Sequence, residues 1–239
     1  MTTLADLTTL RVGGPIARLA SATSADALVD AVAAADAAGG LLLVVGGGSN
    51  LLASDASIIH EDPAGSVVVR AGAGTVWDQF VSWTLSHGLS GVEALSGIPG
   101  TVGASPVQNV GAYGHEVAET ISSVEAYDRL TGNVVRLAPA ELGFAYRSSA
   151  IKRSVGQPGL GDRPWGPTGR WVVFSVDFRL ERSPLSAPVM YSELARRLGV
   201  EAGSRADASL VRSTVLELRR GKGMVLDPAD HDTWSAGSF

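Results

Sequence analysis

Three stretches of the chain place apolar residues one helical turn apart. The first covers residues 25–38, follows a serine that can cap a helix, and ends at a pair of glycines. The second follows Thr75, which has the spacing of a capping box with Asp78, and ends at Gly88. The third covers residues 207–220. The residues that define the three faces are Leu28 and Val32; Trp77, Phe80, Val81 and Thr84; and Leu210, Val211, Thr214, Val215 and Leu218.

Other stretches have the pattern of strands. Residues 171–180 alternate apolar and polar side chains, which predicts a strand with one buried face. Residues 67–70 predict another strand, and residues 123–127 and 134–137 predict a pair joined by a turn. The apolar run at residues 41–45 predicts a buried strand. Helices and strands in this succession predict an α/β (α+β) fold class.

A first glycine-rich segment, residues 46–50, reads Gly-Gly-Gly-Ser-Asn and directly follows the apolar run. Glycines tolerate positive φ, so successive backbone N–H groups can point at an anion. The segment lacks the G-x-G-x-x-G fingerprint and the Gly-Lys-Ser/Thr of a P-loop, which disfavours a nicotinamide-binding Rossmann domain. A flavin diphosphate on another scaffold and an ordinary tight turn both remain open.

A second glycine-rich segment covers residues 97–114, here called the glycine block. It holds five glycines together with Gln108, Asn109 and Tyr113, so it predicts neither a long helix nor a regular strand. Glycines allow close contact with a planar ligand while amide side chains bond its ring N and O atoms. A glycine-rich crossover without a ligand is the alternative.

Arg147 lies among aromatic and small residues at 144–148. The planar guanidinium suits two-point binding of a carboxylate. A solvated surface charge is the alternative for an arginine taken by itself.

Composition excludes several function classes. A formal net charge of −5 over 239 residues gives no basic footprint for nucleic acid. The absence of cysteine excludes disulfides, thiolate metal sites and cysteine nucleophiles, and the four histidines lack ligand spacing, so we assign no metal. The first residues lack a secretion signal, and no apolar run spans a bilayer. We expect a cytoplasmic, monomeric protein without membrane insertion.

Seven motifs occur in a fixed order along the chain. They are T-T-L-R-V-G-G at 8–14, G-G-G-S-N at 46–50, S-G-I-P-G-T-V-G-A-S-P-V-Q-N-V-G-A-Y-G at 96–114, F-A-Y-R-S at 144–148, M-Y-S-E-L at 190–194, R-G-K-G-M-V-L-D-P at 220–228 and S-A-G-S-F at 235–239. Together they resemble the UDP-N-acetylenolpyruvoylglucosamine reductase family, also called UDP-N-acetylmuramate dehydrogenase, in its actinobacterial form. The likeness covers nearly the whole chain.

The resemblance implies the two-subdomain FAD-binding fold of the vanillyl-alcohol-oxidase type, followed by the start of a substrate domain. The implied bounds are 1–62 and 63–183 for the FAD-binding subdomains and 184–239 for the flap and the start of the substrate domain. The residues implied to hold FAD are Gly46, Gly47, Gly48, Ser49, Asn50, Leu51, Gly97, Ile98, Pro99, Gly100, Gly103, Ala104, Ser105, Gln108, Asn109, Gly111 and Ala112.

The resemblance also implies a reaction with two hydride transfers. NADPH reduces FAD, and the reduced flavin reduces UDP-N-acetylglucosamine enolpyruvate to UDP-N-acetylmuramate for peptidoglycan biosynthesis. Arg147 matches the arginine that binds the substrate carboxylate, and Ser238 matches the serine that donates a proton. Tyr191 matches the tyrosine of the substrate flap, and Tyr113 and Lys222 are further expected substrate contacts.

Two departures from the family pattern qualify this expectation. The family continues well past the Gly-Ser-Phe motif into a domain with much of the nucleotide-sugar site and a catalytic Glu, and residues 60–66 are shorter than the family pattern. We therefore expect a C-terminally truncated fragment with weakened FAD affinity and little turnover. A flavin-dependent oxidase of the same fold and a non-catalytic FAD-binding module are the alternatives.

Overall fold

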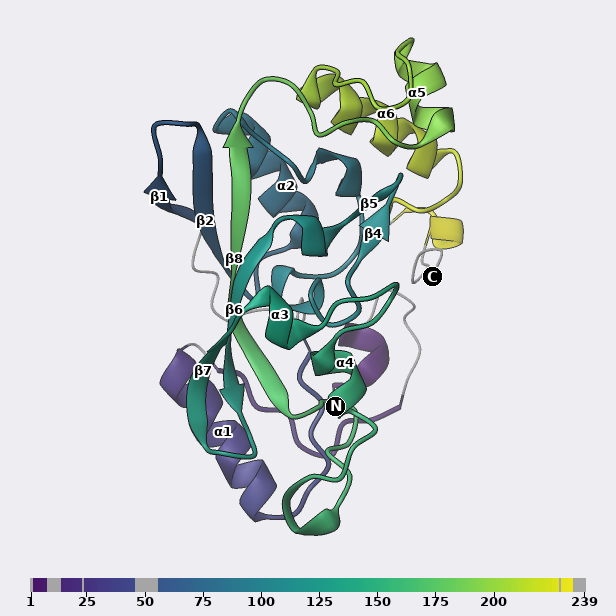
Figure 1. Cartoon of the computed structure of the whole chain (residues 1–239). Coiled ribbons are helices and arrows are strands. Elements are labelled where there is room, and N and C mark those ends of the chain that lie inside the picture. The colour runs from purple at the N-terminus through teal and green to yellow at the C-terminus, as the bar shows by residue number, and fades with distance from the viewer. Residues whose placement is uncertain (1, 8–13, 23, 46–55, 228, 234–239) are drawn as a thin grey trace.

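The computed structural model describes residues 2–7, 14–22, 24–45, 56–227 and 229–233. A long sheet runs through the middle of the molecule, with helix α1 (Ala25–Ala37) at its lower end in Figure 1. Helices α5 (Ser192–Leu198) and α6 (Ala208–Arg220) lie together beyond the opposite end of the sheet (Figure 1).

Six of the described strands form one antiparallel sheet. Its path is β1–β2–β8–β6–β7, and β3 pairs with β8 beside this path. The bounds are β1 Ser57–Glu61, β2 Ser66–Gly72, β3 Leu89–Ser90, β6 Ile121–Asp128, β7 Asn133–Leu137 and β8 Trp171–Arg182. A separate hairpin pairs β4 (Gly111–Ala112) with β5 (His115–Glu116). The strands predicted around residues 67–70, 123–127, 134–137 and 171–180 are confirmed.

The remaining helices are short. Beside α1, α5 and α6 there are α2 (Trp77–Ser86), α3 (Pro139–Leu142) and α4 (Ala150–Ser154). One-turn 3-10 helices cover Leu4–Leu7, Glu93–Leu95, Val102–Ala104, Val117–Glu119, Leu160–Asp162 and His231–Thr233. No helix in the described ranges is long and apolar enough to cross a membrane.

Strand β8 organises the core. Its buried face is the predicted one, with Val172, Phe174, Val176, Phe178 and Leu180 all buried. The opposite face is only partly open to solvent, because Asp177 is buried there between Arg70 and Arg136, with N–O distances of 2.7 and 2.6 Å. A charged residue on a polar face can therefore be covered by long partner side chains.

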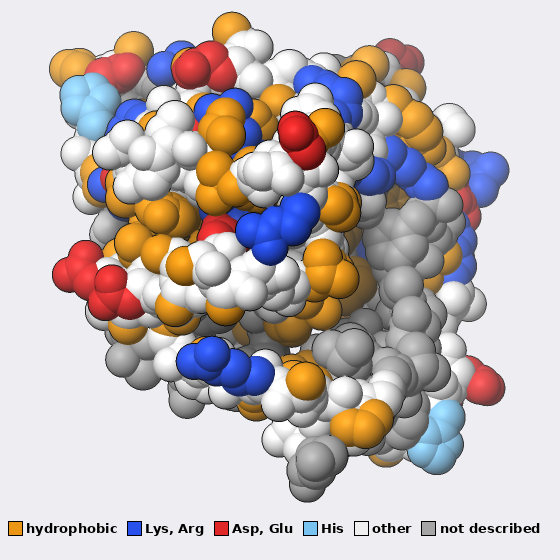
Figure 2. Space-filling model, turned by 90° about the horizontal axis from the view of Figure 1, so that it is seen from below, with side chains coloured by type: hydrophobic (Ala, Val, Ile, Leu, Met, Phe, Trp, Pro, Cys, Tyr) orange, Lys and Arg blue, Asp and Glu red, His pale blue; other side chains and the backbone are white. Residues whose placement is uncertain are grey.

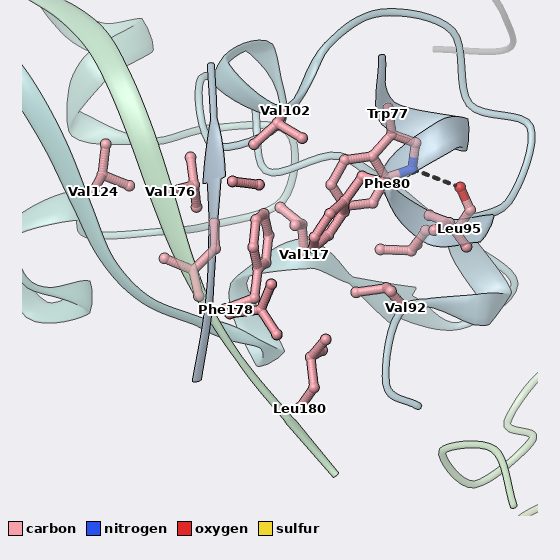
Figure 3. Packing of buried hydrophobic residues seen from close by; sticks show 14 of the residues in the cluster. Trp77, Phe80, Val92, Leu95, Val102, Val117, Val124, Val176, Phe178 and Leu180 are labelled. Atoms are coloured by element: carbon pink, nitrogen blue, oxygen red, sulfur yellow. Dashed lines mark hydrogen bonds between the residues drawn. The ribbon is translucent and has the colours of Figure 1, made fainter. Parts of the chain in front are cut away.

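Helix α2 packs its predicted apolar face on this sheet. The rings of Phe80 and Phe178 lie 4.6 Å apart, and Trp77 donates its indole N–H to Leu95 O at 2.8 Å (Figure 3). The predicted capping box is wrong. Val76 is the N-cap and makes no side-chain cap bond, and Asp78 instead accepts a hydrogen bond from Gly97 N at 2.7 Å. The carboxylate of Asp78 therefore accepts a hydrogen bond from a backbone group distant in sequence and does not cap its own helix.

Helix α1 confirms the first predicted helix. Ser24 caps it by accepting from Ala27 N at 3.1 Å, and Leu28 and Val32 are its buried residues. They pack in a cluster with Tyr127, Val172 and Phe174 of the sheet. Arg129 also holds α1, because Nε donates to Asp36 Oδ2 at 3.0 Å. The helix is thus fixed against one end of the sheet.

The strand predicted at residues 41–45 is wrong. The segment is not in a described strand, and Leu41 and Leu43 are exposed. Its neighbour is the loop that carries Thr168, and the two segments share two hydrogen bonds. Val44 N donates to Thr168 Oγ1 at 2.7 Å, and Thr168 N donates to Leu42 O at 3.1 Å. Irregular backbone beside the segment offers no regular ladder for it to join.

Residues 184–224 carry the third predicted helix and an unpredicted one, α5. Asp207 caps α6 by accepting from Leu210 N at 2.8 Å. The two helices share their own small core, which includes Val189, Leu194 and Val215. This unit is joined to the 3-10 helix Glu93–Leu95 by buried Glu93, whose carboxylate accepts from Ala187 N at 2.6 Å.

Candidate functional site

A cleft of about 200 Å³ lies where helix α1 and the 41–45 segment meet the sheet. One wall includes Leu28 and Val44, and another includes residues 171–174 of β8 and Ile151 of α4. Most of the lining is apolar, with Thr101 and Thr168 among the polar exceptions. A concave, mainly apolar site with a few hydrogen-bonding groups suits a flat organic ligand. Figure 2 shows a hollow bordered by hydrophobic side chains on the face seen from below.

Gly103 shapes the wall formed by the glycine block. Its N–H donates to Ala73 O at 2.9 Å, which draws the block against the turn after β2. A Cβ added to Gly103 would lie 2.5 Å from Ala73 Cβ, so only glycine allows this approach. Gly103, Ala104 and Ala73 all line the cleft. Gly103 thus lets the glycine block pack directly on the turn after β2, and the block residues that line the cleft are Thr101, Gly103, Ala104 and Val107.

The other expected FAD residues fall into two groups. Residues 46–51 lie outside the described residues, so Gly46, Gly47, Gly48, Ser49, Asn50 and Leu51 are not placed. The expected residues of the block that do not line the cleft are Gly97, Ile98, Pro99, Gly100, Ser105, Gln108, Asn109, Gly111 and Ala112. Of the expected residues that are described, the cleft thus brings together only Gly103 and Ala104.

Asn109 instead holds the glycine block together. It has a left-handed φ of 51° and is 2% exposed. Its amide N donates to Glu116 Oε2 at 2.6 Å and to Ala145 O at 3.2 Å, and its amide O accepts from Ala118 N at 3.0 Å. These three bonds use nearly all of the side chain's hydrogen-bonding capacity inside the fold.

Arg147 sits in a tight turn that Asn109 ties to the glycine block through Ala145 O. Ala145 and Ser148 exchange two backbone hydrogen bonds of 3.0 Å, and Arg147 has a left-handed φ of 50°. Its guanidinium lies 5.4 Å from the ring centroid of Tyr146, which is 77% exposed. A strained, partly exposed cation at the edge of a glycine-rich loop is typical of a ligand contact.

Three expected substrate residues converge at another corner. The rings of Tyr113 and Tyr191 meet edge to face, with centroids 5.5 Å apart. Burial raises the pKa of Tyr113, while the charges of Lys222 and Arg219 act to lower it. Lys222 Nζ lies 3.5 Å from Glu193 Oε2. The corner therefore combines phenol hydroxyls and basic groups, which can hold an anion.

The segment that carries Tyr191 is held by a contact with the β4–β5 hairpin. His115 is buried, with Nε2 2.8 Å from Pro188 O and Nδ1 2.7 Å from Glu119 Oε2. Both ring nitrogens thus face acceptor oxygens. The contact with Pro188 O holds the backbone three residues before Tyr191. The last expected catalytic residue, Ser238, lies outside the described residues.

Sequence reasoning missed two features of the site. Leu28 and Val44 line the cleft, but their apolar periodicity signals burial and cannot distinguish a core from a ligand site. Arg219 was also missed. It lies four residues after Val215 on the buried face of α6, where an arginine is out of place, and that was the available signal. Among the described residues, no group of three His, Cys, Asp or Glu side chains can hold a metal ion.

Comparisons with known proteins give a consistent picture. A family model described as an FAD binding domain matches residues 16–138. UDP-N-acetylenolpyruvoylglucosamine reductases from Salinispora arenicola and Mycolicibacterium gilvum are 50% and 49% identical to the chain over 99% of its length. The chain spans 65% of the length of each of these relatives.

A solved structure shares the fold. The crystal structure of the UDP-N-acetylenolpyruvylglucosamine reductase from Thermus caldophilus matches with a TM-score of 0.59 at 24% identity. The match covers 92% of this chain and 68% of the Thermus chain.

Proposed function

Because the chain belongs to the FAD-binding domain family, we propose that it binds FAD as part of a UDP-N-acetylenolpyruvoylglucosamine reductase. The proposed reaction is the NADPH-driven reduction of UDP-N-acetylglucosamine enolpyruvate to UDP-N-acetylmuramate, a cytoplasmic step of peptidoglycan biosynthesis. The observation that carries the proposal is 50% identity to a reductase of this name over 99% of the chain.

The cleft supports FAD as the ligand. It is mainly apolar, and the glycine block lines it with small residues, among them Gly103 and Ala104, held close to the turn after β2. These features fit a flat, extended group that packs on apolar and small residues. FAD would supply hydride transfer between NADPH and the enolpyruvyl double bond. The glycine segment at 46–51 and the remaining residues of the block stay proposed FAD contacts.

The expected division of the chain follows from this assignment. We propose that residues 1–62 and 63–183 are the two FAD-binding subdomains and that 184–239 begin the substrate domain. The cleft supports this division because α1 and Val44 form one wall while β8 and the glycine block form the other. The separate hydrophobic core of residues 189–218 supports a third unit.

Arg147 is the proposed partner of the substrate carboxylate. Hydride addition to the enolpyruvyl group places negative charge toward that carboxylate, and a fixed guanidinium stabilises this charge more in the transition state than in the ground state. The tight turn at Ala145–Ser148 limits the positions the arginine can reach, which favours such a fixed role. Ser238 would donate the proton to the adjacent carbon, a contribution of about 10²–10⁴-fold in rate.

Tyr113, Tyr191 and Lys222 are the proposed contacts for the rest of the substrate. The T-shaped tyrosine pair links the glycine block to the segment before α5, and Lys222 supplies a positive charge beside it. A substrate held at this corner would therefore touch both the FAD-binding units and the third unit.

A stepwise experiment tests the proposal on the 239-residue chain. Titration with FAD should quench flavin fluorescence and give a yellow protein. Anaerobic NADPH should bleach the colour, and enolpyruvyl substrate should restore it slowly in a single turnover. Folded, pure chain that stays colourless with excess FAD contradicts the proposal, and bound flavin that NADPH leaves yellow favours a non-catalytic binding module.

The variant Arg147→Ala separates the role of Arg147 from FAD binding. It should bind FAD and be bleached by NADPH as the parent chain is, yet restore colour at least 100-fold more slowly with substrate. The matched control is Arg179→Ala, which removes an exposed arginine of β8 and should leave all three steps unchanged. A normal rate for Arg147→Ala would remove Arg147 from the mechanism.

A further inference from the structure

Strained backbone conformations gather around the proposed substrate residues. In the described part of the chain, four non-glycine residues have a left-handed φ. Three of them are Asn109, Tyr113 and Arg147, with φ values of 51°, 52° and 50°. This conformation is unfavourable for a residue with a side chain and persists only where the surrounding contacts hold it. The contacts around these three residues therefore indicate which positions the fold fixes.

The turn that carries Arg147 is held on two sides. Two backbone hydrogen bonds of 3.0 Å between Ala145 and Ser148 close it. Lys152 Nζ donates to Arg147 O at 2.9 Å, and Asn109 Nδ2 donates to Ala145 O at 3.2 Å. Lys152 is exposed, whereas Asn109 is buried. Because water competes less for a buried hydrogen bond, Asn109 is the firmer of the two anchors.

Tyr113 occupies a second strained turn, at the tip of the β4–β5 hairpin. Tyr113 and Gly114 form the two-residue loop between the paired strands, and both have a positive φ. The same Nδ2 of Asn109 donates to Glu116 Oε2 of β5 at 2.6 Å. Ala118 N, just beyond this strand, donates to Asn109 Oδ1 at 3.0 Å. Asn109 therefore also holds the base of the hairpin that carries Tyr113.

The hairpin is connected in turn to the segment before α5. Glu119 Oε1 accepts from Glu116 N at 2.9 Å, and Glu119 Oε2 lies 2.7 Å from His115 Nδ1. His115 Nε2 lies 2.8 Å from Pro188 O. Polar contacts therefore lead from Asn109 through the hairpin to the third of the segments that carry proposed substrate contacts.

We propose that Asn109 is a positioning residue for substrate reduction, because its buried amide fixes the turn of Arg147 relative to the hairpin of Tyr113. The inference rests on the proposed function, in which Arg147 binds the substrate carboxylate and Tyr113 another part of the same molecule. A misplacement of about 1 Å in such a site can cost about 100-fold in rate. Asparagine suits this role since it tolerates a left-handed φ while its amide both donates and accepts. Any contact of Asn109 with FAD would then come from its backbone.

The variant Asn109→Gly removes the amide and keeps the backbone, because glycine adopts a left-handed φ freely. It should bind FAD and be bleached by NADPH as the parent chain is. Enolpyruvyl substrate should then restore the colour at least about 10-fold more slowly at saturation, with a change of about threefold or less in the half-saturating concentration. Asn133→Gly is the matched control. The exposed Asn133 donates to Thr131 O in the turn between β6 and β7, and its loss should leave every step unchanged.

Two further comparisons distinguish positioning from general loosening of the fold. In an Arg147→Ala background, Asn109→Gly should slow the restoration step by no more than about threefold, since most of its effect passes through Arg147. Glu116→Ala should slow the step in the parent chain, and Glu116→Gln, whose amide oxygen can still accept from Asn109, should recover most of the rate. A full 10-fold loss in the Arg147→Ala background overturns the proposal. So does loss of FAD binding or of NADPH bleaching in Asn109→Gly.

Hydrogen exchange supplies a readout that needs neither substrate nor turnover. The backbone amides of Ala145 and Ser148 bond across the turn, and they should exchange at least about 10-fold faster in Asn109→Gly than in the parent chain. Asn133→Gly should leave both exchange rates unchanged. Parent-like exchange in Asn109→Gly overturns the proposal even where the reductase assay succeeds. A parent chain that substrate never returns to yellow contradicts the proposed function instead, and the exchange rates still show whether Asn109 holds the turn.

Discussion

Asp78 of helix α2 and Arg212 of helix α6 form a two-point ion pair, with Nη1–Oδ1 at 2.6 Å and Nη2–Oδ2 at 2.8 Å. The same Oδ1 accepts from Gly97 N at 2.7 Å. One carboxylate therefore joins the sheet-packed helix, the first residue of the glycine block and the third unit. It also holds Gly97 beside Arg219, since a Cβ added to Gly97 would lie 3.2 Å from Arg219 Nε.

A double-mutant cycle should reveal this coupling. Asp78→Asn and Arg212→Met should each destabilise the chain by about 1–2 kcal/mol, because charge-assisted hydrogen bonds are lost from a pair that is still partly exposed. The double variant should cost less than the sum, and urea unfolding measures all three values. Glu181→Gln, which breaks the more exposed pair with Arg205, is the control and should cost less than about 1 kcal/mol. Additive effects of Asp78→Asn and Arg212→Met would contradict the coupling.

Stability should fall in acid through three aspartates. Burial by itself raises the pKa of Asp177, but hydrogen bonds from Arg70, Ser123 and Arg136 outweigh it and hold the pKa below the ordinary value of 3.8. The pKa values of Asp78 and Asp128 are likewise lowered, against burial, by Arg212 and Arg170. A lowered folded-state pKa gives stability that is present above the unfolded value and is lost as pH falls through the folded value.

The urea midpoint should therefore be nearly constant from pH 7 to about pH 5 and fall steeply below about pH 4. Asp177→Asn should be less stable than the parent at pH 7 and should lose less of its remaining stability on acidification. An equal pH slope in parent and variant would exclude Asp177 as a source of the acid sensitivity.

Gly103→Ala should destabilise the chain and weaken ligand binding in the cleft. The new Cβ would lie 2.5 Å from Ala73 Cβ and 3.0 Å from Ala73 Cα, so backbone must move. We expect a loss of about 1–3 kcal/mol and a Tm lower by roughly 3–8 °C. Gly14→Ala is the control, because a Cβ there would have nothing within 4 Å. Adding Ala73→Gly should recover part of the loss; no recovery would show that the contact with Ala73 is not the cause.

Arg129→Met should loosen helix α1 from the sheet. The variant leaves Asp36 and three backbone oxygens without their partner, for which we expect a loss of about 3–5 kcal/mol. Since Leu28 of α1 lines the cleft, FAD affinity should fall as well. Arg18→Met changes an exposed arginine and should stay within about 0.5 kcal/mol of the parent. Parent-like unfolding of Arg129→Met would mean that α1 is held by its apolar face alone.

Much of the fold could be predicted from local pattern. Alternation in residues 171–180 identified the buried face of β8, and helical spacing identified the apolar faces of α1, α2 and α6. These predictions succeed because burial of one face imposes a period that each element carries in its own sequence. The FAD-binding fold implied by the ordered motifs is confirmed by the family match over residues 16–138.

The candidate site was only partly predictable. The sequence of the glycine block predicts a loop that can contact a ligand closely, and Gly103 and Ala104 do line the cleft. The side-chain amide of Asn109, however, donates to Glu116 and Ala145 inside the fold. Glycine and amide residues indicate backbone freedom and hydrogen-bonding capacity. Their presence in a sequence does not show whether a ligand or the chain itself forms the hydrogen bonds.

What the sequence alone determined is thus the place and buried faces of helices α1, α2 and α6 and of strand β8, and the FAD-binding fold. Only the tertiary structure decided that residues 41–45 meet a loop rather than a strand and that the carboxylate of Asp78 binds Gly97 and Arg212 rather than its own helix. It also decided that Arg219 is buried with its Nε unpartnered. The physical reason is that periodicity is a local property, whereas partners far apart in the chain are chosen by how the elements pack.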